Sequence, residues 1–142
     1  MKLHTRRLMA IAGLLLAGAA AALNAQTTDT VTDVPFAFTV GTATLPRDTY
    51  RISRLPGHTD AFLIRGLREG AIMVSQPEGA SETDPSPRLV FYRYADSYFL
   101  REVRMPGNTG FKLPRTRGEL QAAEQLASRS TPEVVVLRAR PE

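Results

Sequence analysis

A histidine and an aspartate two positions apart are the first residues whose types could do chemistry. They are His58 and Asp60, in the stretch PGHTD. In a hydrolase built from a serine, a histidine and an acid, the histidine acts as a general base beside a positioned serine. The sequence contains no GxSxG motif to supply that serine, and Pro56-Gly57 predicts a solvent-exposed turn. We therefore expect His58 to be a turn residue, and we predict no catalytic residue.

Three acidic residues in one segment are the next candidates for chemistry. Glu78, Glu82 and Asp84 belong to EGASETDPSP, whose composition predicts a loop over residues 78–87. Catalytic carboxylate pairs of glycoside hydrolases stand rigidly about 5–9 Å apart across a cleft, which one loop rarely provides. The spacing also does not match an EF-hand calcium loop. We expect a solvated loop with no metal site, and we predict no cofactor.

Residue types that are missing exclude further chemistry. The chain contains no cysteine, so thiol catalysis, disulfide bonds and cysteine-ligated zinc sites are excluded. The stretch GNTG, from Gly107 to Gly110, lacks the lysine and the following helix of a phosphate-binding loop. It predicts a turn.

The elements that must position any site are mainly strands, and the clearest of them form an aromatic hairpin. The chain has four tyrosines and six phenylalanines, and five of these ten aromatic residues lie in LVFYRYADSYFLREV, from Leu89 to Val103. The turn is predicted near Ala95-Asp96-Ser97. A turn of even length pairs Phe91 with Leu100, whereas a three-residue turn changes the pairing.

Both faces of this hairpin are apolar, because strand alternation places Phe91 and Tyr92 on opposite faces. An exposed aromatic platform for flat ligands is one interpretation, and a buried core is the other. Aromatic residues at strand spacing are core residues far more often, so we predict burial. Tyr94 and Tyr98 flank the turn, and we expect their hydroxyls to reach solvent, which makes them weak candidates for binding.

A short amphipathic helix is predicted from Thr116 onward, in TRGELQAAEQLASR. Thr116 as the N-cap and Glu119 three positions later match a capping box. Leu120 and Ala123 fall on one helical face, which we expect to cover the second face of the aromatic hairpin.

Short apolar runs separated by turn residues predict strands along most of the remaining chain. We predict a mainly β fold: an antiparallel β-sandwich or open barrel of about seven strands, with one C-terminal helix packed on it. Apart from the hairpin, strands are predicted in the segments 36–40, 50–55, 61–65, 71–76 and 133–139.

The beginning of the chain has the pattern of an export signal. Three basic residues, Lys2, Arg6 and Arg7, precede an apolar run from Leu8 to Leu23, and small residues continue to Ala25. The run is less apolar than a spanning helix, so we predict no stable membrane span after cleavage. The predicted organisation is a signal peptide over 1–25, a flexible lead-in over 26–33 and a single β-rich domain over 34–142.

Removal of the signal changes the charge of the protein. Of 18 basic residues three lie in the signal, which leaves 15 basic against 14 acidic residues and a net charge of +1. The basic residues that remain are arginines apart from Lys112. We therefore predict no nucleic-acid partner.

Three segments cover most of the predicted domain: VPFAFTVGTATLPRDTYRI, LVFYRYADSYFLREV and GFKLPRTRGEL. In their order and spacing they resemble a family of short exported bacterial proteins of unknown function. That family usually carries glycine in two turns where this chain has Arg47-Asp48 and Ala95-Asp96. The resemblance implies an exported β-rich domain, and it implies no particular activity.

We predict an exported, periplasmic or extracellular protein without enzymatic activity. It would bind a macromolecule of the cell envelope or extracellular space, or associate structurally. Arginines near turns are the candidates for contacts with acidic partners. They are Arg47, Arg104 and Arg115.

Two alternative functions remain open. The first is a small barrel that carries an apolar ligand in a cavity of several hundred Å³. Phe36, Phe38, Phe91 or Phe99 would line that cavity. The second is an unrecognised hydrolase around His58, which would require a cleft that holds the histidine with an acid and a serine or a bound water.

Overall fold

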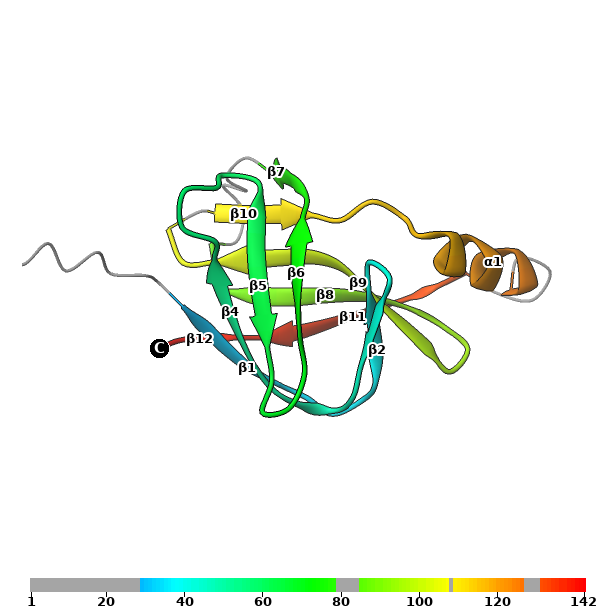
Figure 1. The fold of residues 1–142 in the computed structure, drawn as a ribbon. Coiled ribbons are helices and arrows are strands. Elements are labelled where there is room, and N and C mark those ends of the chain that lie inside the picture. Colours follow the sequence, from blue (N-terminus) through cyan, green and yellow to red (C-terminus); the bar gives the residue numbers. More distant parts are fainter. Residues whose placement is uncertain (1–28, 79–84, 108, 127–130) are drawn as a thin grey trace, which may run out of the picture.

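The structure is a computed structural model that describes residues 29–78, 85–107, 109–126 and 131–142. Two β-sheets lie face to face with their strands crossing steeply, and the helix lies to one side of them (Figure 1). The predicted signal peptide lies outside the described residues, as does most of the predicted loop over 78–87.

The first sheet has the strand order β12-β1-β4-β5-β6, and its neighbouring strands are antiparallel. Its strands are β1 (Thr30–Val34), β4 (Asp48–Arg54), β5 (Ala61–Arg65), β6 (Gly70–Val74) and β12 (Arg140–Pro141).

The second sheet has the order β11-β8-β9-β10-β7, again with antiparallel neighbours. A small hairpin of β2 and β3 joins it, because Thr39 of β2 pairs with Phe99 of β9 in a parallel bridge. The strands are β2 (Phe38–Val40), β3 (Ala43–Leu45), β7 (Gln76–Glu78), β8 (Arg88–Tyr94), β9 (Ser97–Met105), β10 (Thr109–Lys112) and β11 (Glu133–Arg138).

Two bent strands connect the sheets at opposite edges. One residue, Ser75, separates β6 in the first sheet from β7 in the second, and one residue, Ala139, separates β11 from β12. At each bend the chain passes from one sheet to the other without a loop. The two sheets are therefore connected by the backbone at both edges. The prediction of a mainly β, antiparallel sandwich or barrel with one helix near the C-terminus is confirmed. The described part of the chain has twelve strand segments rather than about seven, because bends and short pairings divide it more finely.

The core between the sheets is built on aromatic rings. Phe38, Tyr50, Phe62, Phe91 and Phe111 are fully buried. Phe38 meets Tyr50 and Phe91 edge-to-face, with ring centroids 5.3 Å and 5.2 Å apart, the geometry that aromatic pairs prefer. Aromatic residues of both sheets therefore pack together in the space between the sheets.

The aromatic hairpin β8–β9 has the register expected for a turn of even length. Phe91 lies opposite Leu100 and Tyr92 opposite Phe99, and Phe91 and Phe99 are buried. The interpretation of this hairpin as core is therefore confirmed for these rings. Further along, Val90 lies opposite Glu102. Strand β9 therefore contains one extra residue, Arg101, which has no pairing partner in β8. This β-bulge was not predicted.

The first described residues correct one prediction. Residues 30–33, predicted as part of a flexible lead-in, form most of β1 and pair with β4. Thr30, Thr32 and Val34 alternate as buried residues, so the segment has the period of a strand with threonines in apolar positions. Residues 26–28 lie outside the described part.

Helix α1 (Arg117–Leu126) begins as predicted. The Glu119 backbone N–H donates to Thr116 Oγ1 at 3.2 Å, and the Leu120 N–H donates to the Thr116 carbonyl oxygen at 3.0 Å. The predicted contact face is wrong, since Leu120 is 45% exposed whereas Glu119 is buried. No helix among the described residues is long and apolar enough to cross a membrane.

Candidate ligand-binding site

The bulge residue Arg101 connects sheet and helix at two points. Its backbone carbonyl accepts a hydrogen bond from the Leu113 N–H at 2.8 Å, which fixes the segment that leads into α1. Its side chain extends to the helix itself, where Nη1 lies 3.2 Å from Glu119 Oε2. Bulges redirect side chains and often occur beside functional sites. Here the bulge places a guanidinium group between β9 and α1.

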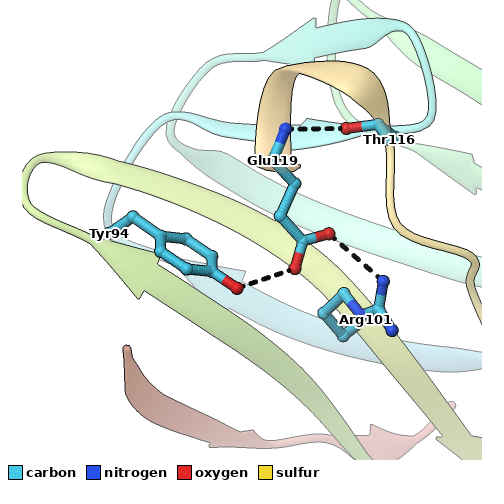
Figure 2. A network of polar contacts seen from close by, with 4 residues as sticks. All are labelled: Tyr94, Arg101, Thr116 and Glu119. Atoms are coloured by element: carbon cyan, nitrogen blue, oxygen red, sulfur yellow. Dashed lines mark hydrogen bonds and ion pairs between the residues drawn. The ribbon is translucent and has the colours of Figure 1, made fainter. Parts of the chain in front are cut away.

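The Glu119 carboxylate is the anchor of α1 on the second sheet (Figure 2). Its side chain is 1% exposed, and each of its oxygens has a partner. Oε2 pairs with Arg101, and Oε1 accepts a hydrogen bond from the Tyr94 hydroxyl at 3.1 Å. A buried carboxylate is tolerated in a fold only when it is paired and hydrogen-bonded, and this one is both.

Tyr94 differs from its predicted environment. Burial, followed by the neighbouring Glu119 carboxylate, raises the pKa of Tyr94 above the ordinary tyrosine value. The hydroxyl therefore stays protonated and serves as a donor to Glu119. The expectation that this hydroxyl reaches solvent is wrong, because the residue is buried beneath the helix.

A cavity of about 520 Å³ lies beside this network, at the corner where β6 turns into β7. Its walls come from four places in the chain: the residue before β5, the β6–β7 bend, the β9 bulge, and the end of β10 with the segment that follows it. The lining residues are Asp60, Val74, Ser75, Arg101, Lys112, Leu113 and Pro114. Its volume is within the range typical of small-molecule pockets, and it combines apolar with polar groups as such pockets do.

Two polar atoms of the lining residues have no hydrogen-bond partner among the residues that the structure describes. Ser75 Oγ and Arg101 Nε are both buried and unpaired, and Ser75 as a whole is only 7% exposed. Leaving a buried donor unsatisfied costs about 1–3 kcal/mol. Asp29 and Thr30, at the start of the described chain, hold the other two such atoms. Both residues line the cavity, but these two atoms have almost no accessible surface.

The five residues predicted as binding candidates lie elsewhere. Among the described residues that line the cavity, none of them occurs. Arg47 and Arg115 are exposed, on the turn before β4 and in the segment before α1. Arg104 is buried in β9, where its Nε pairs with Glu102. Tyr98 is half-buried and stacks on Phe36, with ring centroids 3.8 Å apart.

The groups considered for catalysis are also dispersed. His58 lies in the exposed turn between β4 and β5, and its backbone N–H donates to the Leu55 carbonyl oxygen. Asp60 lines the cavity, but His58 does not. In the described part of the chain, no three histidine, aspartate or glutamate side chains are grouped as metal ligands would be.

The rings proposed to line an apolar cavity fill space instead. Phe38 and Phe91 are fully buried and pack edge-to-face against each other. Phe36 contacts Phe91 in the same way, with ring centroids 5.1 Å apart. The cavity beside the β6–β7 bend lies outside this aromatic cluster and has different walls.

A scan against protein-family models, a search of curated proteins and a search of solved structures give no match to this chain.

Proposed function

We propose that this protein is an exported, non-enzymatic binding domain whose ligand occupies the cavity beside the β6–β7 bend. The N-terminal sequence pattern supports export. The observation that supports binding is the cavity itself, whose walls combine apolar with polar side chains as small-molecule pockets do.

The geometry favours binding over catalysis. A serine nucleophile needs an adjacent base within hydrogen-bond reach, whereas Ser75 Oγ has no hydrogen-bond partner among the described residues. The Arg101 guanidinium is already paired with Glu119. The polar groups of the cavity are thus arranged to hold a molecule, without the relay that activates a nucleophile.

A macromolecular partner is the kind of ligand that the cavity rim favours. On β6, Ile72 and Val74 expose 62% and 67% of their surface, and Val74 also lines the cavity. Apolar side chains at the rim of a pocket give a protein surface area to pack on, while one side chain of the partner enters the pocket. This fits an envelope or extracellular protein as the partner.

The test is capture of partners from the native host with matched variants. Fractionation should first find the processed protein outside the cytoplasm. The purified domain is then immobilised and exposed to an envelope and culture-fluid extract, with Val74→Asp as the cavity variant. Val136→Asp is the control, because Val136 is similarly apolar and 50% exposed but lies on β11, away from the cavity.

We expect wild type and Val136→Asp to retain the same molecule and Val74→Asp to lose it. Cytoplasmic localisation would contradict the export part of the proposal. Equal retention by both variants would contradict the cavity as the binding site.

A further inference from the structure

We propose that the outer face of the first sheet binds a small aliphatic carboxylate, with the carboxylate on Arg51 and Arg65 and the aliphatic part on Leu67. The site is a second cleft, of about 480 Å³, which shares no lining residue with the cavity at the β6–β7 bend. The inference therefore goes beyond the proposed function and does not depend on it.

Two arginines lie side by side in this cleft. Arg51 of β4 pairs directly with Arg65 of β5, so both side chains leave the same face of the sheet, with their Cβ atoms about 4.5–5.5 Å apart. Both residues are exposed, and the side chain of Arg51 is 52% exposed. A ligand in the cleft can therefore reach both guanidinium groups. Like charges directly opposite each other destabilise a sheet, and an anion bound between them would offset this repulsion.

Among the described residues, only one of these two guanidinium groups has a carboxylate partner. Glu142 forms an ion pair with Arg51, whereas no described side chain forms an ion pair or a hydrogen bond with the guanidinium of Arg65. Arg140 of β12 continues the row of arginines, because it pairs with Val31, which pairs with Arg51. Three guanidinium groups thus stand beside one side-chain carboxylate. A free main-chain carboxylate at Glu142 would still leave one positive charge in excess.

Three other acidic residues in this part of the first sheet do not line the cleft. They are Asp33, Asp48 and Glu69. The interaction between exposed charges falls with distance and is screened by salt. The charges that act most strongly on a bound ligand are therefore those of the lining, which are Arg51, Arg65 and Glu142.

An apolar wall completes the cleft. Leu67, in the turn between β5 and β6, is 88% exposed, which makes it the most exposed large apolar residue in the described chain. The turn is held in place, because the Leu67 N–H donates to Asp48 Oδ2 and the Gly66 N–H donates to the Glu69 carbonyl oxygen, both at 2.8 Å. Val31 adds a second apolar group from β1. An aliphatic chain would pack on these side chains, where each fully buried methylene strengthens binding about fourfold.

These features favour a ligand with a single carboxylate. The guanidinium fork matches the planar geometry of a carboxylate, and Glu142 already places such a group on Arg51. One guanidinium group without a partner, that of Arg65, suits one further negative charge. Exposed ion pairs are weak, so the ligand can share Arg51 with Glu142. The volume lies in the lower part of the range of small-molecule pockets, which suits a short aliphatic chain.

The experiment compares four probes at constant pH and ionic strength. Hexanoate has a carboxylate and an aliphatic chain, hexanamide keeps the chain without the charge, and acetate keeps the charge with one methyl group. Inorganic phosphate is the fourth probe. Binding to the purified protein is followed by amide chemical shifts in NMR titrations. We expect hexanoate to bind most tightly, at least about threefold more tightly than acetate, and to shift the resonances of Arg51, Arg65 and Leu67.

Two variants test the two halves of the site. Arg65→Gln removes a charge that has no ion pair among the described residues, so the protein should stay folded while the affinity for hexanoate falls about five- to tenfold. Leu67→Ser should weaken the binding of hexanoate and leave that of acetate unchanged. Arg115→Gln is the matched control, because Arg115 is also exposed but lies in the segment before α1.

Four results would contradict the inference. They are binding of hexanamide as tight as that of hexanoate, tighter binding of phosphate than of hexanoate, equal losses of affinity in Arg65→Gln and Arg115→Gln, and binding of no probe. Val74→Asp, the variant at the β6–β7 cavity, should bind hexanoate as wild type does. Retention of the native partner by that variant would therefore refute the proposed function and leave this second site in place.

Discussion

The Arg101 guanidinium and the Glu119 carboxylate form a buried ion pair, 3.2 Å apart, that joins strand β9 to helix α1. Glu119 is both the residue that completes the helix N-cap and the residue through which the helix contacts the sheet. The backbone N–H of Glu119 takes part in the N-cap, and its side chain docks the helix on the sheet. Since Arg101 also lines the cavity, the position of α1 and the shape of the candidate site are linked.

Replacement of Glu119 should destabilise the protein strongly. Glu119→Ala leaves the guanidinium of Arg101 and the hydroxyl of Tyr94 without their acceptor, and removal of one partner of a buried pair costs about 3–5 kcal/mol. Urea unfolding followed by circular dichroism measures this loss. Glu124→Ala is the control on the same helix, because Glu124 is exposed and should change stability by less than about 0.5 kcal/mol. Equal effects of the two substitutions would contradict the anchoring role.

Tyr50 should make stability depend on alkaline pH. Burial, and next the carboxylates of Asp48 and Glu69, raise the pKa of Tyr50 to about 12, against about 10 in an unfolded chain. The fold therefore favours the protonated hydroxyl, which donates to the Pro46 carbonyl oxygen. This contribution is complete below pH 10 and is lost as the pH rises towards 12.

The two-unit difference corresponds to about 2–3 kcal/mol. In a titration of tyrosinate absorbance, Tyr50 and Tyr94 should both ionise later than an ordinary tyrosine, and the component near pH 12 should be missing in Tyr50→Phe. The unfolding free energy of wild type should decrease more steeply from pH 10 to 12 than that of the variant. Parallel curves for the two proteins would contradict the assignment.

Ala95→Gly should stabilise the aromatic hairpin. Ala95 has φ of 52°, the one positive φ of a non-glycine residue in the described chain. The left-handed region costs a residue with a Cβ about 1–2 kcal/mol, and the extra freedom of glycine in the unfolded chain offsets about 0.4–1 kcal/mol of the gain. We expect a net increase of about 0.5–1 kcal/mol in thermal or urea unfolding. Asp96→Gly is the control and should destabilise slightly, so a gain there and none at Ala95 would refute the interpretation.

Two glycine substitutions should have opposite effects. A Cβ at Gly66 would lie 2.7 Å from Asp48 Oδ2 and 2.8 Å from Tyr50 Cε1, so Gly66→Ala should cost about 1–3 kcal/mol by overpacking. A Cβ at Gly118 would have no neighbour nearer than 3.9 Å. Gly118→Ala should therefore add up to about 1 kcal/mol of helix propensity. Comparison of the two melting temperatures checks both signs.

Local rules reduce the hairpin register to two alternatives, one for an even turn and one for a three-residue turn. An even turn at Ala95-Asp96 fixes the pairing of Phe91 with Leu100, and the structure has this pairing. The bulge at Arg101 could not be predicted, since alternation in LREV gives no sign of an extra residue. Its position depends on contacts with Leu113 and Glu119, which are distant in sequence.

Strand β1 was missed for a different reason. Thr30 and Thr32 occupy buried positions, and a polar, threonine-rich segment gives a weak apolar signal. The hydroxyl of Thr32 is accommodated because it donates to the Arg138 carbonyl oxygen. Because Arg138 is far from Thr32 in the sequence, the residues of β1 alone do not indicate this hydrogen bond.

The candidate site was beyond sequence-based prediction altogether. Its polar groups, Asp60, Ser75, Arg101 and Lys112, come from separate segments and carry no motif. The strand bend at Ser75 and the bulge at Arg101 bring them together. By contrast, the residues singled out for their position near turns, such as Arg47 and Arg115, remain apart from the cavity.

The Thr32–Arg138 hydrogen bond spans 106 positions of the sequence, and the pairing of β1 with β12 is similarly distant. During synthesis β1 leaves the ribosome long before β12, its second neighbour in the sheet. One edge of β1 therefore has no pairing partner until β12 has been synthesised. Contacts of such separation slow folding, and a nascent chain with an open strand edge is the form that a chaperone would need to shield.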